Sequence, residues 1–153
     1  MIFCDMDGVL VDFNGAFQRK FGIAPSSLPR EQLWEKVLNT ENYWCNLPKA
    51  KNADKLVDCL NKYGFCILTG LPAYGYDKAE KEKRIWLKEN YNKECDVICC
   101  LSKDKQNFGK KNDILIDDLE KNIQRWEEMG GIGILHTSAE NTIKKLEELI
   151  KNG

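Results

Sequence analysis

Acidic, hydroxyl and lysine side chains, which can serve in catalysis or metal binding, lie where four short apolar runs end. Asp5 closes the first run, Thr69 closes the second, Ser102–Lys105 follows the third, and Asp117 with Asp118 closes the fourth. Ligands of an open parallel α/β sheet bind beyond the carboxyl ends of its strands, so these acids, the hydroxyl and a lysine would meet in one crevice. Carboxylates brought so close repel one another unless a cation lies among them. The set therefore predicts a hard divalent ion, and Mg²⁺ with several retained waters fits it.

The elements that must position these residues follow from the apolar pattern. Short apolar runs bounded by polar residues or glycine are typical of strands buried on both faces, and five are present: Ile2–Asp5, Phe65–Thr69, Asp96–Leu101, Ile114–Asp117 and Ile132–Leu135. The segments between them predict helices over Asp77–Tyr91 and from Leu119 to Gly130, and a last helix that begins with Thr137 and Glu140 in capping-box spacing. This alternation predicts an α/β fold, a Rossmann-like parallel sheet of about five strands flanked by helices.

One long stretch interrupts the alternation. Residues 14–51 hold two helix-like pieces, Ala16–Phe21 and Arg30–Leu38, separated by the loop-like Ala24–Ser27. We interpret this stretch as a small helical cap inserted after the first strand, so that residues 1–13 and 52–153 form the catalytic core. The charged run Lys78–Arg84 is interpreted as the solvated face of a helix.

Composition limits the possible partners and the compartment. The 153 residues carry a net charge of -1, so no global field recruits a nucleic-acid polymer or an anionic membrane. No apolar run reaches the roughly 18 residues of a membrane span, and the chain starts without a signal-peptide pattern, so we expect a cytoplasmic protein. A zinc site at Cys95, Cys99 and Cys100 is disfavoured, because adjacent residues of a strand point to opposite faces.

The polar strand ends resemble a known family. The stretch Asp5–Asp12 reads DxDGxxxD after an apolar strand and is similar to the first motif of haloacid dehalogenase superfamily phosphatases. Thr69-Gly70 resembles the second motif of that family, and Asp117-Asp118 its fourth. Lys105 is preferred over Lys103 as the lysine of the third motif, because it heads a segment similar to the family's.

Within the superfamily the chain is most similar to the 5'(3')-deoxyribonucleotidase group, including small bacterial and phage-like members. The stretches that carry this likeness are Asp5–Phe13, Tyr43-Trp44 with Leu47-Pro48, Lys83–Trp86, and Asp113–Ile123 with Trp126. The resemblance implies a substrate that is a small phosphorylated metabolite, expected to be a nucleoside monophosphate, and a monomer or homodimer. Phe13, Tyr43 and Trp44 would contact the base, although packing in the cap is an equal alternative for each of them. Trp34 and Trp86 are assigned to packing, and His136 to a structural role.

The resemblance also implies a role for each polar residue. Asp5 would attack phosphorus and form an aspartyl-phosphate, and Asp7 would protonate the leaving alkoxide and later deprotonate a water. Asp5, the carbonyl of Asp7 and Asp117 would hold Mg²⁺, with Asp118 assisting. Thr69, the amide of Gly70 and Lys105 would bind the phosphoryl group. Gly8 would allow the tight turn after the nucleophile.

Several alternatives stay open from the sequence. A general small-metabolite or sugar phosphatase would use the same scaffold, and a non-catalytic binding domain would keep the sheet without turnover. Dehalogenase chemistry needs the nucleophile but no acid for an alkoxide, so Asp7 argues against it. Asp118 could instead be the N-cap of the helix that begins near Leu119.

Overall fold

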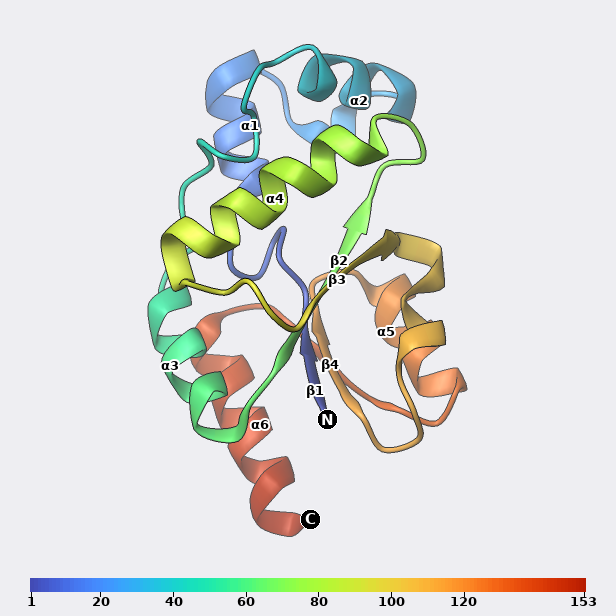
Figure 1. The fold of residues 1–153 in the computed structure, drawn as a ribbon. Helices are drawn as coiled ribbons and strands as arrows, with labels where there is room; N and C mark the ends of the chain where they lie inside the picture. Colours follow the sequence, from blue (N-terminus) through green and yellow to red (C-terminus); the bar gives the residue numbers. More distant parts are fainter.

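Five parallel strands form the centre of the structure, a computed structural model that describes residues 1–153 (Figure 1). The strands are β1 (Ile2–Cys4), β2 (Cys66–Leu71), β3 (Val97–Leu101), β4 (Ile114–Asp117) and β5 (Ile132–Leu135). Their order across the sheet is β3-β2-β1-β4-β5, and all neighbouring pairs are parallel. The predicted five-stranded, Rossmann-like sheet is confirmed.

The strand order creates a crevice beside β1. The chain adds β2 and β3 on one side of β1 and then returns to add β4 and β5 on the other side. The connections therefore leave β1 and β4 in opposite directions, which is where open α/β sheets bind ligands. β4 and β5 have the predicted bounds, whereas β1 stops one residue before Asp5 and β2 runs two residues past Thr69.

Helices cover both faces of the sheet (Figure 1). α3 (Ala53–Tyr63) and α6 (Ala139–Asn152) pack together on one face, and α5 (Glu120–Glu128) with the 3-10 helix η2 (Ser102–Phe108) lies on the other. Side chains of successive strand residues enter different hydrophobic clusters: Cys4 and Ile67 belong to the larger cluster, Phe3 and Leu68 to the smaller. This period of two explains why the strands are apolar throughout, since each strand is buried on both faces.

The residues predicted as the cap form a layer above the carboxyl ends of the strands. They hold α1 (Phe13–Phe21), the 3-10 helix η1 (Pro25–Ser27) and α2 (Arg30–Leu38). α1 begins three residues earlier than predicted, and the expected loop at Pro25–Ser27 is a short helix. The chain enters and leaves this layer through two adjacent segments, since the amide of Asp12 donates to the carbonyl of Pro48 and that of Ala50 to the carbonyl of Leu10.

The interpretation of the charged run Lys78–Arg84 as a solvated face is wrong for two of its charged residues. α4 (Tyr76–Tyr91) lies between the cap and the rest of the molecule (Figure 1), so it is covered from two sides. Glu82 and Lys83 are consequently buried, at 4% and 1% exposure. Glu82 accepts from the backbone amide of Trp44, which joins α4 to the cap, and from the ammonium of Lys78 one turn earlier on the same helix.

The start of α6 also differs from the prediction. Ser138 is the N-cap, and its hydroxyl accepts from the amide of Asn141. Thr137 lies one residue outside and accepts from the side-chain amide of Asn141, while Glu140 accepts from Asn52. The capping box proposed for Thr137 and Glu140 is therefore absent, because the serine next to Thr137 fills the N-cap position.

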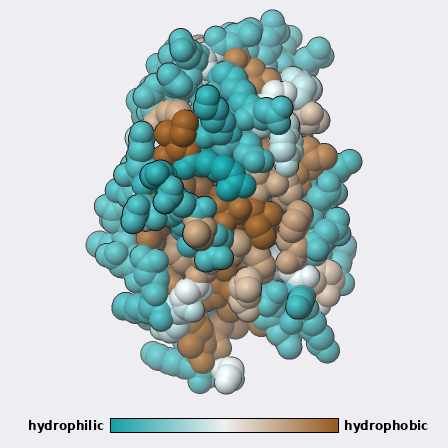
Figure 2. Space-filling view, viewed as in Figure 1, coloured by the Kyte–Doolittle hydropathy of each residue, from teal (hydrophilic) through white to brown (hydrophobic).

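The surface is mainly polar. Figure 2 shows hydrophilic side chains over the cap and over the outward side of α4, with hydrophobic residues mainly in the middle of this face, where the edge strand β3 lies in Figure 1. None of the helices combines the length and the apolar character that crossing a membrane requires.

Candidate functional site

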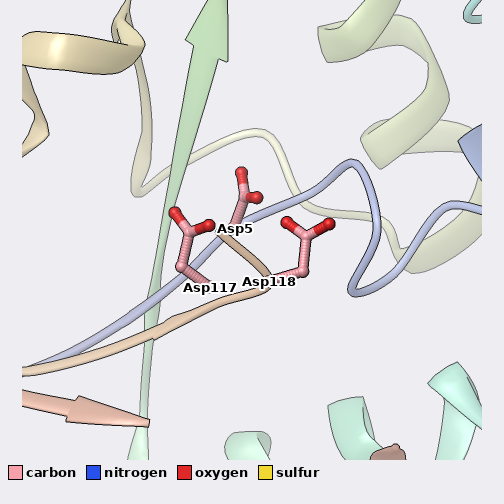
Figure 3. A group of neighbouring side chains, drawn as sticks. All are labelled: Asp5, Asp117 and Asp118. Carbon is pink, nitrogen blue, oxygen red and sulfur yellow. The ribbon is translucent and has the colours of Figure 1, made fainter. Parts of the chain in front are cut away.

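Three carboxylates meet at the carboxyl ends of β1 and β4. In Figure 3 the side chains of Asp5, Asp117 and Asp118 point to the same side of the sheet. Each of the three offers an oxygen atom, and these atoms lie within 4.8 Å of one another. Asp5 follows β1 directly, and Asp117 ends β4, so the parallel pairing of these two strands brings the acids together. The predicted crevice is present.

Gly8 makes room for this cluster. Its φ is +82°, a left-handed conformation that a residue with a side chain rarely adopts. A Cβ atom placed on Gly8 would lie 2.0 Å from Oδ2 of Asp118. The turn after β1 therefore depends on glycine both for its backbone conformation and for its close approach to Asp118.

Lys105 is the lysine that contacts Asp5. Its ammonium donates to Oδ1 of Asp5 at 2.8 Å and to Oδ2 of Asp117 at 2.7 Å, and the side chain is buried. Burial opposes the charge, yet the two carboxylates prevail and raise the pKa of Lys105 above its ordinary value. Lys103 is exposed. The structure therefore agrees with the choice of Lys105, which η2 carries inward.

The two acids of the fourth strand have different surroundings. Asp117 accepts from Lys105, from the side-chain amide of Asn122 at 3.0 Å and from the amide of Leu119 at 2.9 Å. Leu119 is the N-cap residue of α5, which begins at Glu120, so the N-cap alternative for Asp118 is wrong. Asp118 has no such donors on its carboxylate oxygens, and it lines the cavity described below.

The electrostatics of the cluster favour a cation. Burial, followed by the neighbouring charge of Asp117, raises the pKa of Asp118 to about 6 and raises that of Asp5 well above its ordinary value. Lys105 supplies one positive charge to three carboxylates, which leaves negative charge in a buried site. Oxygen ligands and uncompensated charge are what Mg²⁺ requires, so the residues present fit the predicted ion.

Asp7 is held by two donors that the sequence did not reveal. Lys83 donates to its Oδ2 at 2.9 Å, and Nε1 of Trp44 donates to the same oxygen at 3.3 Å. The other oxygen, Oδ1, has no hydrogen-bond partner. One carboxylate oxygen is therefore anchored, and the second is free to carry or accept a proton.

Lys83 also connects Asp7 to the end of β2. Its ammonium donates to Oγ1 of Thr69 at 3.0 Å and to the carbonyl of Gly70 at 2.7 Å, and it lies over the ring of Trp44. Thr69 is fully buried beneath this lysine, and it is Gly70 and Lys83 that reach the cavity wall. The hydroxyl of Thr69, predicted to contact a phosphoryl oxygen, accepts from Lys83 and does not line the cavity.

A cavity of about 430 Å³ opens above these residues, within the usual size range of small-molecule sites. Its polar lining includes Asp5, Asp7, Lys83, Lys105 and Asp118, and its apolar lining is Phe13, Leu28, Leu33, Trp34, Leu71 and Leu119. The apolar residues come mainly from the cap. The cavity thus combines a charged end on the sheet with an aromatic wall on the cap.

The aromatic residues of this wall are only partly those predicted. Phe13 lines the cavity as expected. Tyr43 and Trp44 do not, since they are buried in the cap, at 4% and 0% exposure, in contact with each other and with Trp34 or Phe13. The prediction that Tyr43 and Trp44 contact a base is therefore wrong, and so is the assignment of Trp34 to packing alone, because Trp34 lines the cavity.

Lys83 is the main functional residue that the sequence analysis missed. A signal for it exists, because Lys83 is four residues from Ala79 and from Leu87 and three from Trp86, all of which are buried on α4. A lysine on such an apolar stripe indicates a buried charge with a partner. As for the cysteines, all seven are free, and the group of side chains placed to hold a metal contains aspartates alone.

Comparison with known proteins places the fold. No protein-family model and no curated protein match the chain by sequence. A solved structure, that of a hydrolase from Streptococcus pneumoniae TIGR4, superposes with a TM-score of 0.55 and 14% sequence identity, over 95% of this chain and 97% of the other. Identity this low shows a common fold and nothing finer. Along almost its whole length, the chain therefore has the fold of a bacterial hydrolase.

Proposed function

We propose that the protein is a Mg²⁺-dependent phosphomonoester hydrolase that acts through an aspartyl-phosphate on Asp5. The observation that carries the proposal is the arrangement of Asp5 between Lys105 and Asp118 at the charged end of the cavity. Lys105 occupies Oδ1 of Asp5, and no donor occupies Oδ2. A carboxylate oxygen with a free lone pair, facing a cavity and flanked by a cation, is suited to attack on phosphorus.

The first chemical step uses two acids with separate tasks. Oδ2 of Asp5 forms a bond to phosphorus as the bond from phosphorus to the leaving oxygen breaks, and Lys105 stabilises negative charge on the transferring group. Asp7 gives its proton to the leaving alkoxide. The anchoring of Asp7 on one oxygen by Lys83 and Trp44 supports this task, since it fixes the position of the other oxygen.

The second step returns the enzyme to its starting state. Asp7, now a carboxylate, removes a proton from a water that attacks phosphorus, and the bond from phosphorus to Asp5 breaks to release inorganic phosphate. Asp5, Asp118 and the carbonyl of Asp7 would hold Mg²⁺, which would neutralise charge on the phosphoryl oxygens. We assign Asp118 rather than Asp117 as the direct ligand, because the carboxylate of Asp117 is already occupied by three donors.

The cavity supports a nucleoside monophosphate as the substrate. Phe13 and Trp34 provide aromatic surface on the cap, opposite the charged end, which suits a molecule with a phosphate at one end and a flat ring at the other. A sugar phosphate would leave this aromatic surface without a planar partner.

Phosphate release tests the proposal. Nucleoside 5'-monophosphates, their deoxy forms and sugar phosphates would be compared in Mg²⁺ and in EDTA, with Asp5→Asn as the matched variant. We expect hydrolysis of the nucleotides that needs Mg²⁺ and is lost in Asp5→Asn, whose amide is nearly isosteric but cannot attack phosphorus. Retention of more than trace turnover in a folded Asp5→Asn protein would contradict the nucleophile assignment, and preference for a sugar phosphate would contradict the substrate class.

A further inference from the structure

A second hollow lies next to the catalytic cavity. This groove has a volume of about 510 Å³, and four of its lining residues are cations against one acid, Glu31. The cations are Arg30, Lys103, Lys121 and Arg125. We refer to it as the basic groove.

The cations of the basic groove come from separate parts of the chain. Arg30 begins α2 of the cap, Lys103 lies in η2, and Lys121 and Arg125 are one turn apart on α5. None of the four forms a salt bridge with a carboxylate, although the chain as a whole has a net charge of -1. Like charges gathered from three elements repel one another, and an anion bound among them would relieve that repulsion.

The basic groove is continuous with the catalytic cavity. Six residues line both: Arg30, Trp34, Leu71, Ser102, Leu119 and Asn122. Asn122 donates to Asp117 at 3.0 Å and is hydrogen-bonded to Ser102, so the groove begins within the hydrogen-bond network of the aspartate cluster. One ligand can therefore reach from the catalytic aspartates into the groove.

Aromatic surface lies between the two charged regions. Trp34 lines both hollows, and Tyr74, which is 48% exposed, lines the groove alone. Exposed aromatic side chains of this kind give a flat ring a surface to stack on.

We propose that the substrate carries a second phosphate, and that this phosphate binds in the basic groove while the first one reacts at Asp5. The class is a nucleoside bisphosphate, phosphorylated at both the 5' and the 3' position. The inference rests on the proposed phosphatase function and narrows its substrate. Arg30, Lys121 and Arg125 would bind the phosphate that is not hydrolysed.

The test compares two substrates that differ by one phosphate. We expect kcat/KM in Mg²⁺ to be about tenfold higher for adenosine 3',5'-bisphosphate than for adenosine 5'-monophosphate, the size of one or two charge-assisted hydrogen bonds. Added salt should reduce this ratio, because the groove is open to solvent. Equal values for the two substrates, or a ratio that salt does not change, would overturn the proposal.

Variants of the basic groove test whether its cations cause the preference for the bisphosphate. Lys121→Gln and Arg125→Gln should each lower the ratio of the two kcat/KM values by about threefold or more. Lys144→Gln, an exposed lysine on α6, is the matched control and should leave the ratio at its wild-type value. A ratio that stays constant in both groove variants would refute the role of the groove. A preference for an oligonucleotide 5' end over the bisphosphate would also overturn the proposal as made.

The experiments distinguish a failure of the phosphatase proposal from a failure of the second phosphate site. If the wild-type protein hydrolyses neither compound, the phosphatase proposal fails by itself. Calorimetric titration of the same two compounds into Asp5→Asn with Mg²⁺ then tests the groove without turnover. Tighter binding of the bisphosphate than of the monophosphate, with the difference reduced by Lys121→Gln, would support the second phosphate site. Equal affinity for the two compounds would contradict it.

Discussion

Replacement of Lys83 by methionine tests how the structure positions Asp7, the proposed general acid. Methionine keeps most of the length and the apolar stem of lysine, so the buried space between α4 and β2 stays filled. The change removes the ammonium that contacts Asp7 at 2.9 Å, Thr69 at 3.0 Å and the carbonyl of Gly70 at 2.7 Å. Asp7 then keeps a single donor, Trp44, at 3.3 Å.

The expected size of the effect follows from the general-acid role proposed for Asp7. General acid catalysis contributes about 10²- to 10⁴-fold, and a misplaced catalytic group can lose about 10²-fold. We therefore expect Lys83→Met to lower kcat for a nucleoside monophosphate about 10²-fold, or ~2.7 kcal/mol of transition-state stabilisation. KM should change less, because Lys83 acts mainly through Asp7.

The assay compares leaving groups. A nucleoside alkoxide needs a proton to leave, whereas p-nitrophenolate is stable enough to leave without one. Lys83→Met should lose about 10²-fold with the nucleotide but less than about fivefold with p-nitrophenyl phosphate, and Asp7→Asn should show the same selectivity. Lys81→Met is the matched control, since Lys81 is exposed on the same helix. An equal loss on both substrates would mean that Lys83 only supports the fold, and no loss on either would refute the reasoning.

Three further changes test the metal ligand, the cavity wall and the buried histidine. Asp118→Asn should raise the Mg²⁺ concentration needed for half-maximal activity at least about tenfold, and more than Asp117→Asn does, because it removes the proposed direct ligand. Titration of activity with Mg²⁺ measures both effects, and a larger effect of Asp117→Asn would make Asp117 the ligand. Trp34→Ala should weaken nucleotide binding by about 1 to 3 kcal/mol if a base stacks on Trp34, as measured by KM or by calorimetric titration. An unchanged nucleotide profile would mean that Trp34 serves only in packing. Burial lowers the pKa of His136 below its ordinary value of 6.5, so the unfolded chain takes up the proton first as pH falls, and stability is lost below about pH 6.5. His136→Gln should therefore lose less unfolding free energy than wild type between about pH 7.5 and about pH 5.5 in urea titrations, and an identical loss would contradict a buried, neutral histidine.

The sequence alone determined the sheet and the residues at its carboxyl edge. Each strand is a short apolar run, because a parallel strand is buried on both faces. Four of the five runs end at or are followed by polar residues, since ligands bind beyond the carboxyl ends of the strands. This local rule placed Asp5, a lysine of the segment 103–105 and Asp117-Asp118 in one crevice, and the family resemblance favoured Lys105 within that segment. The sequence also predicted the tight turn at Gly8, whose positive φ is a local property of the turn after β1.

Only the tertiary structure decided which side chains face the cavity from the cap and from α4. Trp34 and Trp44 are equally apolar, and the packing of the cap buries Trp44 and leaves Trp34 in the cavity wall. Lys83 lies in a charged helix that looks solvated in sequence, but the cap covers that helix from above, and a buried ammonium then requires the carboxylate of Asp7. The physical reason is the same in both cases: burial is set by contacts between segments far apart in the chain, and hydrophobic periodicity describes one segment at a time.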